Sequence, residues 1–284
     1  MSSPLEADVR AAAPAAVTDG RDIVSLKKRI AARELTIGSW LSFGYPGVCE
    51  VMATAGFDWL VVDMEHTAID VSQAQQLIQI IDLAGCVPLV RVGENDPLAI
   101  KRAMDAGAHG VIVPMVNTAE EARKAVSSVL YPPAGTRGVG LGRAHAYGLG
   151  FEKYKAWAER ETVMIVQIEH IEGVDNLEEI LAVDGVDGFI VGPYDLSGSL
   201  GRPGDFAHPE VAAALDRVRR IMNESAKVGG YHVVHSNQQE LRDRIDQGYC
   251  FIAYGDDMVF LAEKVRYEAD FVRRYTSGAA HGNP

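Results

Sequence analysis

Eight short, continuously apolar runs recur along the chain, and longer segments with helical spacing separate them. Strands that are buried on both faces have this uninterrupted apolar character, whereas half-buried strands alternate apolar and polar residues. The runs therefore predict parallel strands that are covered on both sides. They lie at Ile37–Ser42, Trp59–Asp63, Pro88–Val92, Gly110–Pro114, Val163–Ile168, Gly188–Val191, Tyr231–Val234 and Phe251–Tyr254.

The segments between the runs carry helix start and stop signals. Asp96 before Pro97, and Thr118 with Glu121 three residues later, are typical N-terminal caps. Eight strands that alternate with helices predict a single-domain (β/α)8 TIM barrel of the α/β class. A doubly wound open sheet is the alternative, but no G-x-G-x-x-G pattern follows the first predicted strand. The helical segments are Val71–Ala84, Pro97–Ala106, Thr118–Val129, Val174–Leu181 and Pro209–Lys227.

Length and composition set the limits for domains and partners. The 284 residues predict one barrel domain at residues 23–275, a mobile N-terminal extension at residues 1–22 and a flexible tail at residues 276–284. The net charge of −12 disfavours nucleic acid and anionic membranes as partners. No apolar run approaches the roughly 20 residues of a membrane span. Three separated cysteines without a C-x-x-C pair suit a reducing cytoplasm, where we expect the protein.

Charged and polar side chains follow several predicted strands, where barrel enzymes place their chemistry. Glu169 and Asp195 come from neighbouring strands, and Gln167 lies two residues before Glu169. Carboxylate oxygens without an accompanying cysteine favour a hard or borderline cation such as Mg²⁺ or Mn²⁺. Two carboxylates leave coordination positions open for water and for the oxygens of a 2-oxo acid. The cation would then act as a Lewis acid that stabilises the developing enolate.

Three further residues at strand ends suit charge stabilisation and proton transfer. Arg91 would place a fixed positive fork beside the developing oxyanion. His66 is the candidate general base because an imidazole titrates near neutral pH, and Asp63 could orient it. A solvated salt-bridge ring with a packed histidine is the structural alternative. The convergence of several charged side chains on one rim disfavours that alternative, because each is costly to bury without a partner.

The positions of the lysines and the sequences after the last two strands limit the possible mechanisms and substrates. A Schiff-base aldolase needs a lysine inside the barrel, but every lysine falls in a helical or connecting segment. The segments His235–Asn237 and Gly255–Asp257 lack the glycine-rich pattern of a barrel phosphate site. We therefore expect neither a covalent imine mechanism nor a phosphorylated substrate.

Taken together, the motifs of this chain resemble those of the HpcH/HpaI aldolase family. These are the class II, metal-dependent pyruvate aldolases of aromatic and sugar-acid catabolism. The resemblance extends from about Thr36 to Lys264, which is nearly the whole chain outside its ends. The matching segments are Gly56–Trp59, Asp63–His66, Val90–Val92, Ile112–Thr118, Tyr131–Pro133, Arg137–Gly140, Gln167–Glu169 and Gly192–Ser197.

The resemblance implies catalytic roles for the matching residues. Glu169 and Asp195 would bind a divalent cation, which is Mg²⁺, Mn²⁺ or Co²⁺. His66 would lead the acid/base chemistry, with Asp63 in a supporting role. Asp105, in the segment Ala103–Gly107, matches an aspartate that partners the base in the family. The implied reaction is reversible retro-aldol cleavage of a 4-hydroxy-2-oxo acid to pyruvate, or hydroxypyruvate, and an aldehyde.

The resemblance also implies a substrate site and an assembly. Arg91 would bind the carboxylate and enolate, Gln167 would hold substrate or bound water, and backbone N–H groups around Tyr194 would cradle the carboxylate. The implied substrate-binding residues are Arg91, Gln167, Gly192, Pro193, Tyr194 and Asp195. Tyr194 replaces a residue that is often small in the family, and the segment Gly140–Tyr147 also departs from the common pattern, so the aldehyde is not assigned. Family members are trimers or hexamers, which predicts a homo-oligomer.

Three alternatives remain open beside the aldolase. A CoA-ester lyase of the citrate or malyl type would need a basic surface for the CoA phosphates, for which Arg137 and Arg143 are candidates. An oxaloacetate decarboxylase or a macrophomate-synthase-like enzyme would use the same enolate site. A non-catalytic barrel would have lost a ligand or the base, whereas Glu169, Asp195 and His66 are all present.

Overall fold

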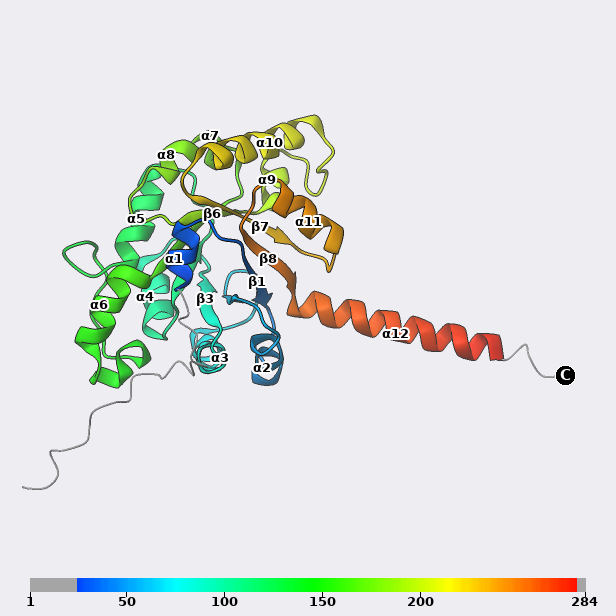
Figure 1. The fold of residues 1–284 in the computed structure, drawn as a ribbon, viewed down its shortest axis with the longest axis horizontal. Helices are drawn as coiled ribbons and strands as arrows, with labels where there is room; N and C mark the ends of the chain where they lie inside the picture. The colour runs from blue at the N-terminus through cyan, green and yellow to red at the C-terminus, as the bar shows by residue number, and fades with distance from the viewer. Residues whose placement is uncertain (1–24, 280–284) are drawn as a thin grey trace, which may run out of the picture.

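The computed structural model describes residues 25–279, so the extension predicted at residues 1–22 lies outside the described residues. Eight parallel strands form a closed barrel in which each strand pairs with the next and the last pairs with the first (Figure 1). The predicted (β/α)8 barrel is therefore confirmed, and the open sheet is excluded. The strands are β1 (Thr36–Leu41), β2 (Trp59–Asp63), β3 (Val87–Arg91), β4 (Gly110–Val113), β5 (Val163–Ile168), β6 (Gly188–Val191), β7 (Val228–Val233) and β8 (Phe251–Asp256).

Helices follow the strands, and the two predicted N-terminal caps are confirmed. The Asp96 carboxylate accepts hydrogen bonds from the backbone N–H groups of Leu98 and Ala99. Thr118 forms a reciprocal capping box with Glu121. In residues 25–279, no helix is long and apolar enough to cross a bilayer. The helices are α1 (Leu26–Ala31), α2 (Pro46–Ala53), α3 (Val71–Leu83), α4 (Pro97–Asp105), α5 (Ala119–Val129), the 3-10 helix η1 (Arg143–Gly148), α6 (Phe151–Glu161), α7 (Ile171–Asp175), α8 (Leu177–Leu181), α9 (Pro193–Ser199), α10 (Pro209–Glu224), α11 (Gln238–Asp246) and α12 (Asp257–Ala279).

Alternate side chains of the strands point into the barrel, where they form an apolar cluster separate from the layer under the helices. Trp59 stacks on Phe251 inside this cluster, with ring centroids 4.1 Å apart. Gly38 leaves room for the indole, because a Cβ at this position would lie 2.1 Å from the Trp59 ring. Leu26 and Ile30 of α1 join the same cluster and close the N-terminal end of the barrel. In the described part of the chain, the C-terminal mouth is therefore the open end of the barrel.

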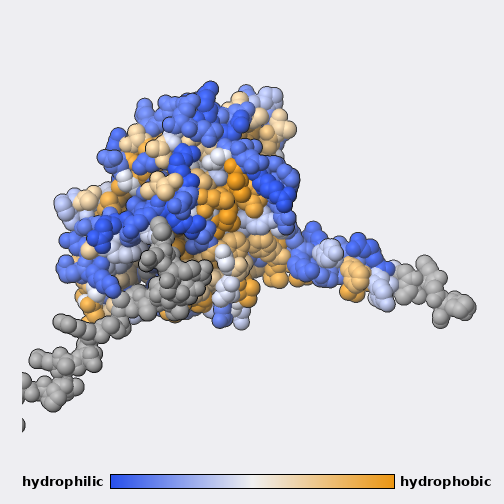
Figure 2. All heavy atoms as spheres, in the orientation of Figure 1, coloured by the Kyte–Doolittle hydropathy of each residue, from blue (hydrophilic) through white to orange (hydrophobic). Residues whose placement is uncertain are grey.

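The last helix does not pack along the barrel as the other helices do. Figure 1 shows α12 projecting away from the barrel, and Figure 2 shows apolar surface on the barrel beside its root. The helix continues to Ala279, beyond the Thr276 boundary predicted for a flexible tail, and residues 280–284 lie outside the described part. Exposed apolar side chains along it are Met258, Leu261, Val265, Tyr267, Phe271, Val272 and Tyr275.

Candidate active site

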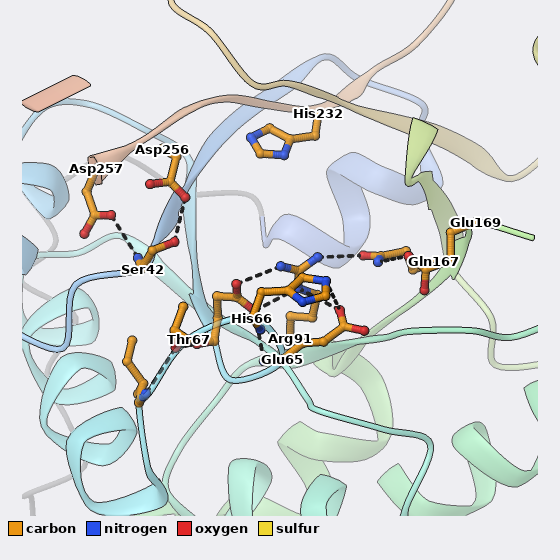
Figure 3. A network of polar contacts seen from close by, with 12 residues as sticks. Ser42, Glu65, His66, Thr67, Arg91, Gln167, Glu169, His232, Asp256 and Asp257 are labelled. Atoms are coloured by element: carbon orange, nitrogen blue, oxygen red, sulfur yellow. Dashed lines mark hydrogen bonds and ion pairs between the residues drawn. The ribbon is translucent and has the colours of Figure 1, made fainter. Parts of the chain in front are cut away.

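Arg91, the last residue of β3, lies at the centre of the polar contacts in the barrel mouth (Figure 3). Its register partner on β2 is Asp63, and the two side chains form a bidentate pair: Nε donates to Oδ1 at 2.9 Å and Nη2 donates to Oδ2 at 2.7 Å. Nη1 donates to Oε1 of Gln167 at 3.4 Å. The guanidinium also lies 4.3 Å over the ring of Trp40. These contacts fix the position of the positive charge.

Asp63 positions the turn that carries His66 rather than the imidazole itself. Its Oδ1 accepts the backbone N–H of Glu65 at 3.0 Å and that of His66 at 3.4 Å. Burial raises the pKa of Asp63, but the Arg91 guanidinium and these N–H donors outweigh burial, and the pKa is lowered. The His66 side chain is 58% exposed at the rim, and its Nε2 lies 3.6 Å from Oε2 of Glu65. The imidazole is therefore accessible to a substrate.

Glu65 is a central residue that the sequence analysis did not select. Its Oε2 lies 3.2 Å from Nε of Arg91, but Nε already donates to Asp63, and Oε2 is buried without a hydrogen bond. Burial raises the pKa of Glu65 to about 7, and the charge of Arg91 opposes this rise while the charges of Asp63 and Asp195 add to it. Within residues 25–279, this carboxylate oxygen in the mouth thus has no hydrogen-bond donor.

Glu169 follows β5 and is almost completely buried. Its Oε1 accepts the backbone N–H of Met115 at 2.7 Å, and its Oε2 accepts from the Gln167 amide. Met115 has a φ of 52°, an uncommon conformation for a residue with a side chain, which aims this N–H at the carboxylate. Gly192 keeps the other side open, because a Cβ there would lie 2.9 Å from Oε2. Burial raises the pKa of Glu169, and the charges of Glu65 and Asp195 also raise it.

Asp195 lies in the first turn of α9, which begins directly after β6 and Gly192. The Tyr194 ring is half-exposed and packs edge-on against Phe206, with ring centroids 5.0 Å apart. The first N–H groups of a helix have no intrahelical acceptor, so those of α9 are available to a ligand beside Pro193. The predicted residues Gly192 to Asp195 therefore lie together at the mouth, on the same side as Glu169.

The carboxylates of the mouth fit a divalent cation. In residues 25–279, no group of three or more His, Cys, Asp or Glu side chains is already arranged as a metal site. The charge of Asp195 nevertheless raises the pKa of both Glu65 and Glu169, so the three carboxyl groups lie near one another. Their mutual repulsion and the unpartnered Oε2 of Glu65 are what a bound cation would relieve. The donors are oxygens, as Mg²⁺ and Mn²⁺ prefer.

Asp105 is the one predicted site residue that the structure does not bring to the mouth of its own barrel. It ends α4, which runs from the mouth back toward the N-terminal end of the strands. There Asp105 accepts from Nη2 of Arg137 at 2.6 Å, and Arg137 is buried. Arg143 pairs in the same way with Asp82, at the end of α3. Both arginines are neutralised away from the mouth, which gives no support to a CoA phosphate site there.

His232 is a second mouth residue that the sequence analysis did not select. The apolar run that predicts this strand begins at Tyr231. The structure begins β7 at Val228, so His232 is the last of the inward-facing positions that start with Val228. The two-residue alternation of a strand would have revealed this position once the start was known.

Comparisons with known proteins agree with this geometry. The family model described as HpcH/HpaI aldolase/citrate lyase matches residues 36–263. A hydroxypyruvate/pyruvate aldolase from Cupriavidus necator is 39% identical over 255 residues, which cover 89% of this chain and 94% of that protein. A 2-dehydro-3,6-dideoxy-6-sulfogluconate aldolase from Pseudomonas putida is 40% identical over 230 residues, or 80% and 89% of the two chains. A crystal structure of a family member from Burkholderia cenocepacia has a TM-score of 0.83 at 36% identity, covering 87% of this chain and 98% of that one.

Proposed function

The chain belongs to the HpcH/HpaI aldolase/citrate lyase family and is a carbon–carbon lyase, and from this premise we propose its reaction. The enzyme cleaves a 4-hydroxy-2-oxo acid reversibly to pyruvate, or hydroxypyruvate, and an aldehyde. The observation that carries the proposal is that the fixed guanidinium group of an arginine lies beside a cluster of carboxylates in the barrel mouth. Asp63 locks Arg91 at the centre, and Glu65, Glu169 and Asp195 gather beside it.

A divalent cation completes the proposed site. Glu169 and Asp195 would hold it, and Glu65 would face it. We propose Mg²⁺, Mn²⁺ or Co²⁺, because every side-chain donor in this cluster is an oxygen. When bound, the cation supplies positive charge opposite the negative charge that develops on the 2-oxo acid.

The protein side chains supply the proton transfers and the orientation. His66 accepts the proton of the C4 hydroxyl, and the C3–C4 bond breaks as the C4 carbonyl forms and the aldehyde leaves. The electron pair of that bond spreads over C3 and the C2 oxygen, where the guanidinium of Arg91 stabilises it. His66 then returns the proton to C3 and yields pyruvate. Gln167 and the N–H groups of Tyr194 and Asp195 would orient the carboxylate.

Two alternative reactions differ in how well the site supports them. Decarboxylation of oxaloacetate produces the same enolate at the same position, so we expect it as a side activity. A CoA-ester lyase would need cations for the CoA phosphates. Arg137 and Arg143 do not serve this need, since each is paired with a carboxylate away from the mouth. The aldolase is therefore the favoured function.

We also propose a homo-oligomer, either a trimer or a hexamer. Helix α12 supports this proposal. It carries an exposed stripe of apolar side chains, spaced three and four residues apart as helix packing requires. Residues of this stripe include Leu261, Val265 and Val272. In an oligomer, Asp105 would act on a base only if it reached the mouth of another copy, because α4 carries it away from His66 in its own.

The test of this function is pyruvate release in the wild type and in Glu169→Gln, followed with lactate dehydrogenase and 4-hydroxy-2-oxo acids as substrates. The variant keeps the shape of the side chain but removes its charge, so we expect kcat/KM to fall by at least about 100-fold. Glu172→Gln, on the exposed face of α7, is the matched control. Undiminished activity of Glu169→Gln in chelated buffer would contradict the proposal.

A further inference from the structure

His232, on β7, faces the barrel mouth from the side opposite to Arg91 on β3. On β7, Val228 belongs to the interior cluster, whereas Tyr231 and Val233 belong to the layer under the helices. His232 therefore points inward at the top of the strand. Figure 3 shows its ring across the mouth from Arg91.

One hydrogen bond fixes the tautomer of this ring. Nε2 lies 3.1 Å from the backbone oxygen of Gly255 on β8. A carbonyl oxygen only accepts, so Nε2 carries the hydrogen and Nδ1 carries a lone pair. Burial lowers the pKa of His232 to about 4, and the ring is neutral near pH 7. The ring of Trp40, with its centroid 5.4 Å away, limits its movement. Nδ1 is thus a fixed hydrogen-bond acceptor.

The fold makes no use of this acceptor. Among residues 25–279, no donor contacts Nδ1, and the side chain of His232 is only partly buried. Two of the neighbouring donors are committed, since Arg91 donates to Asp63 and Gln167 and Ser42 donates to Asp256. In the same part of the chain, the indole N–H of Trp40 is buried without an acceptor, and it makes no hydrogen bond to Nδ1. The neighbouring carboxylates of Asp63 and Asp256 are acceptors themselves. Nδ1 is therefore available to a donor group of a ligand in the mouth.

We propose that His232 is a specificity residue that accepts a hydrogen bond from a hydroxyl group of the substrate. The inference rests on the proposed function, since it assumes a 2-oxo acid between Arg91 and the carboxylates of β5 and α9. An apolar side chain could pack against Trp40 in place of the imidazole, but it would leave a substrate hydroxyl without a partner. The hydroxyl has two sources: the C3 hydroxyl of hydroxypyruvate as donor, or a hydroxyl of the aldehyde.

The experiment compares substrates with and without that hydroxyl in His232→Leu, His232→Asn and the wild type. One arm follows C3-proton exchange of hydroxypyruvate and of pyruvate in D₂O with Mn²⁺, and the other follows addition of pyruvate to glycolaldehyde and to acetaldehyde. We expect His232→Leu to lose about 5- to 100-fold in kcat/KM for the hydroxylated member of one pair, with the other member within about threefold. His232→Asn places an amide oxygen near the Nδ1 position and should recover part of the loss. His235→Leu, in the exposed loop that follows β7, is the control.

Each outcome assigns the hydroxyl group that His232 binds or overturns the proposed role of His232. Loss confined to hydroxypyruvate assigns the hydroxyl to the donor, and loss confined to glycolaldehyde assigns it to the aldehyde. Equal effects on both members of each pair, or no effect at all, overturn the role of His232 while leaving the aldolase intact. Absence of pyruvate exchange in the wild type with Mg²⁺, Mn²⁺ or Co²⁺ contradicts the proposed function, and the inference falls with it.

Discussion

At the scale of single residues, the mouth depends on the geometry of Arg91 rather than on its charge alone. The guanidinium uses both of its edges at once, toward the two oxygens of Asp63 and toward Gln167, while its flat face lies over Trp40. Lysine carries the same charge, but as a point charge it cannot satisfy two parallel acceptors or lie flat on an indole. The arrangement therefore requires arginine.

The substitution Arg91→Lys tests this requirement. We expect kcat/KM to fall by about 100-fold or more, since a positioned donor to the developing negative charge is lost. The far-ultraviolet circular dichroism should stay unchanged, because the residue lies at the mouth rather than in the core. Arg102→Lys, on the exposed side of α4, serves as the control. Kinetic constants of Arg91→Lys equal to those of the wild type would remove Arg91 from the mechanism.

Residue types and strand ends predicted part of this site. Strand ends converge in a barrel, so Asp63, Arg91 and Gln167 could be expected together, and the structure brings them into contact. The role of Asp105 is implied by the resemblance alone, and strand ends carry no information about it because it ends a helix near the N-terminal end of the barrel. Glu65 was passed over because the sequence does not reveal that its Oε2 is left without a donor.

At the scale of elements, the sequence predicted strands better than helices. Each strand is buried on both sides and leaves an apolar run, whereas several helices bury little. Helix α11 has no buried residue and α6 has only Ala158, so neither produced a strong hydrophobic period. The predicted segment at Val174–Leu181 is instead two short helices that meet at Asn176. A break of this kind depends on packing that the sequence does not display.

The junction of β8 and α12 makes a pH-dependent contribution to stability. The Asp257 carboxylate accepts the backbone N–H of Ser42 at 2.9 Å and that of Phe43 at 3.1 Å, which ties α12 to the turn after β1. Burial raises the pKa of Asp257 from 3.8 to about 7. The folded state then retains a proton that the unfolded state has lost. The stability from this group is present in full below the unfolded pKa and is lost as the pH rises through about 7.

Urea unfolding of the chelated protein between about pH 5 and about pH 8 measures this contribution. The wild type should lose more stability over this range than Asp257→Asn, which has no carboxyl to titrate. Because groups far from this junction titrate equally in both proteins, the difference between the two slopes reports on Asp257 together with the neighbouring carboxyl of Asp256. Parallel slopes would show that the pKa of Asp257 is not raised in the folded state.

At the scale of the whole molecule, both the barrel and α12 expose apolar surface. The helix leaves the barrel after its first turn, and an apolar area remains on the barrel beside its root (Figure 2). A helix with exposed Leu261, Val265 and Val272 gains stability when another surface covers this stripe. A second copy of the chain, which carries both the helix and the uncovered area, fits the proposed homo-oligomer.

The double substitution Leu261→Glu with Val265→Glu should therefore reduce the molar mass in sedimentation equilibrium to that of one chain. Charges in a covered apolar stripe are costly to bury, whereas they are tolerated on an exposed helix. Arg266→Glu changes the charge of the same helix at another exposed position and should leave the assembly intact. An unchanged molar mass of the double variant would exclude α12 from the interface.

The central claim is that the barrel mouth generates the enolate of a 2-oxo acid with the help of a divalent cation. The most direct measurement is exchange of the C3 protons of pyruvate in D₂O, followed by NMR. The protein is tested after chelation and after addition of Mg²⁺, Mn²⁺ or Co²⁺, and no aldehyde is required. We predict that chelation stops the exchange and that at least one of these cations restores it. Exchange that persists undiminished in chelated protein, or that no cation restores, would contradict the account.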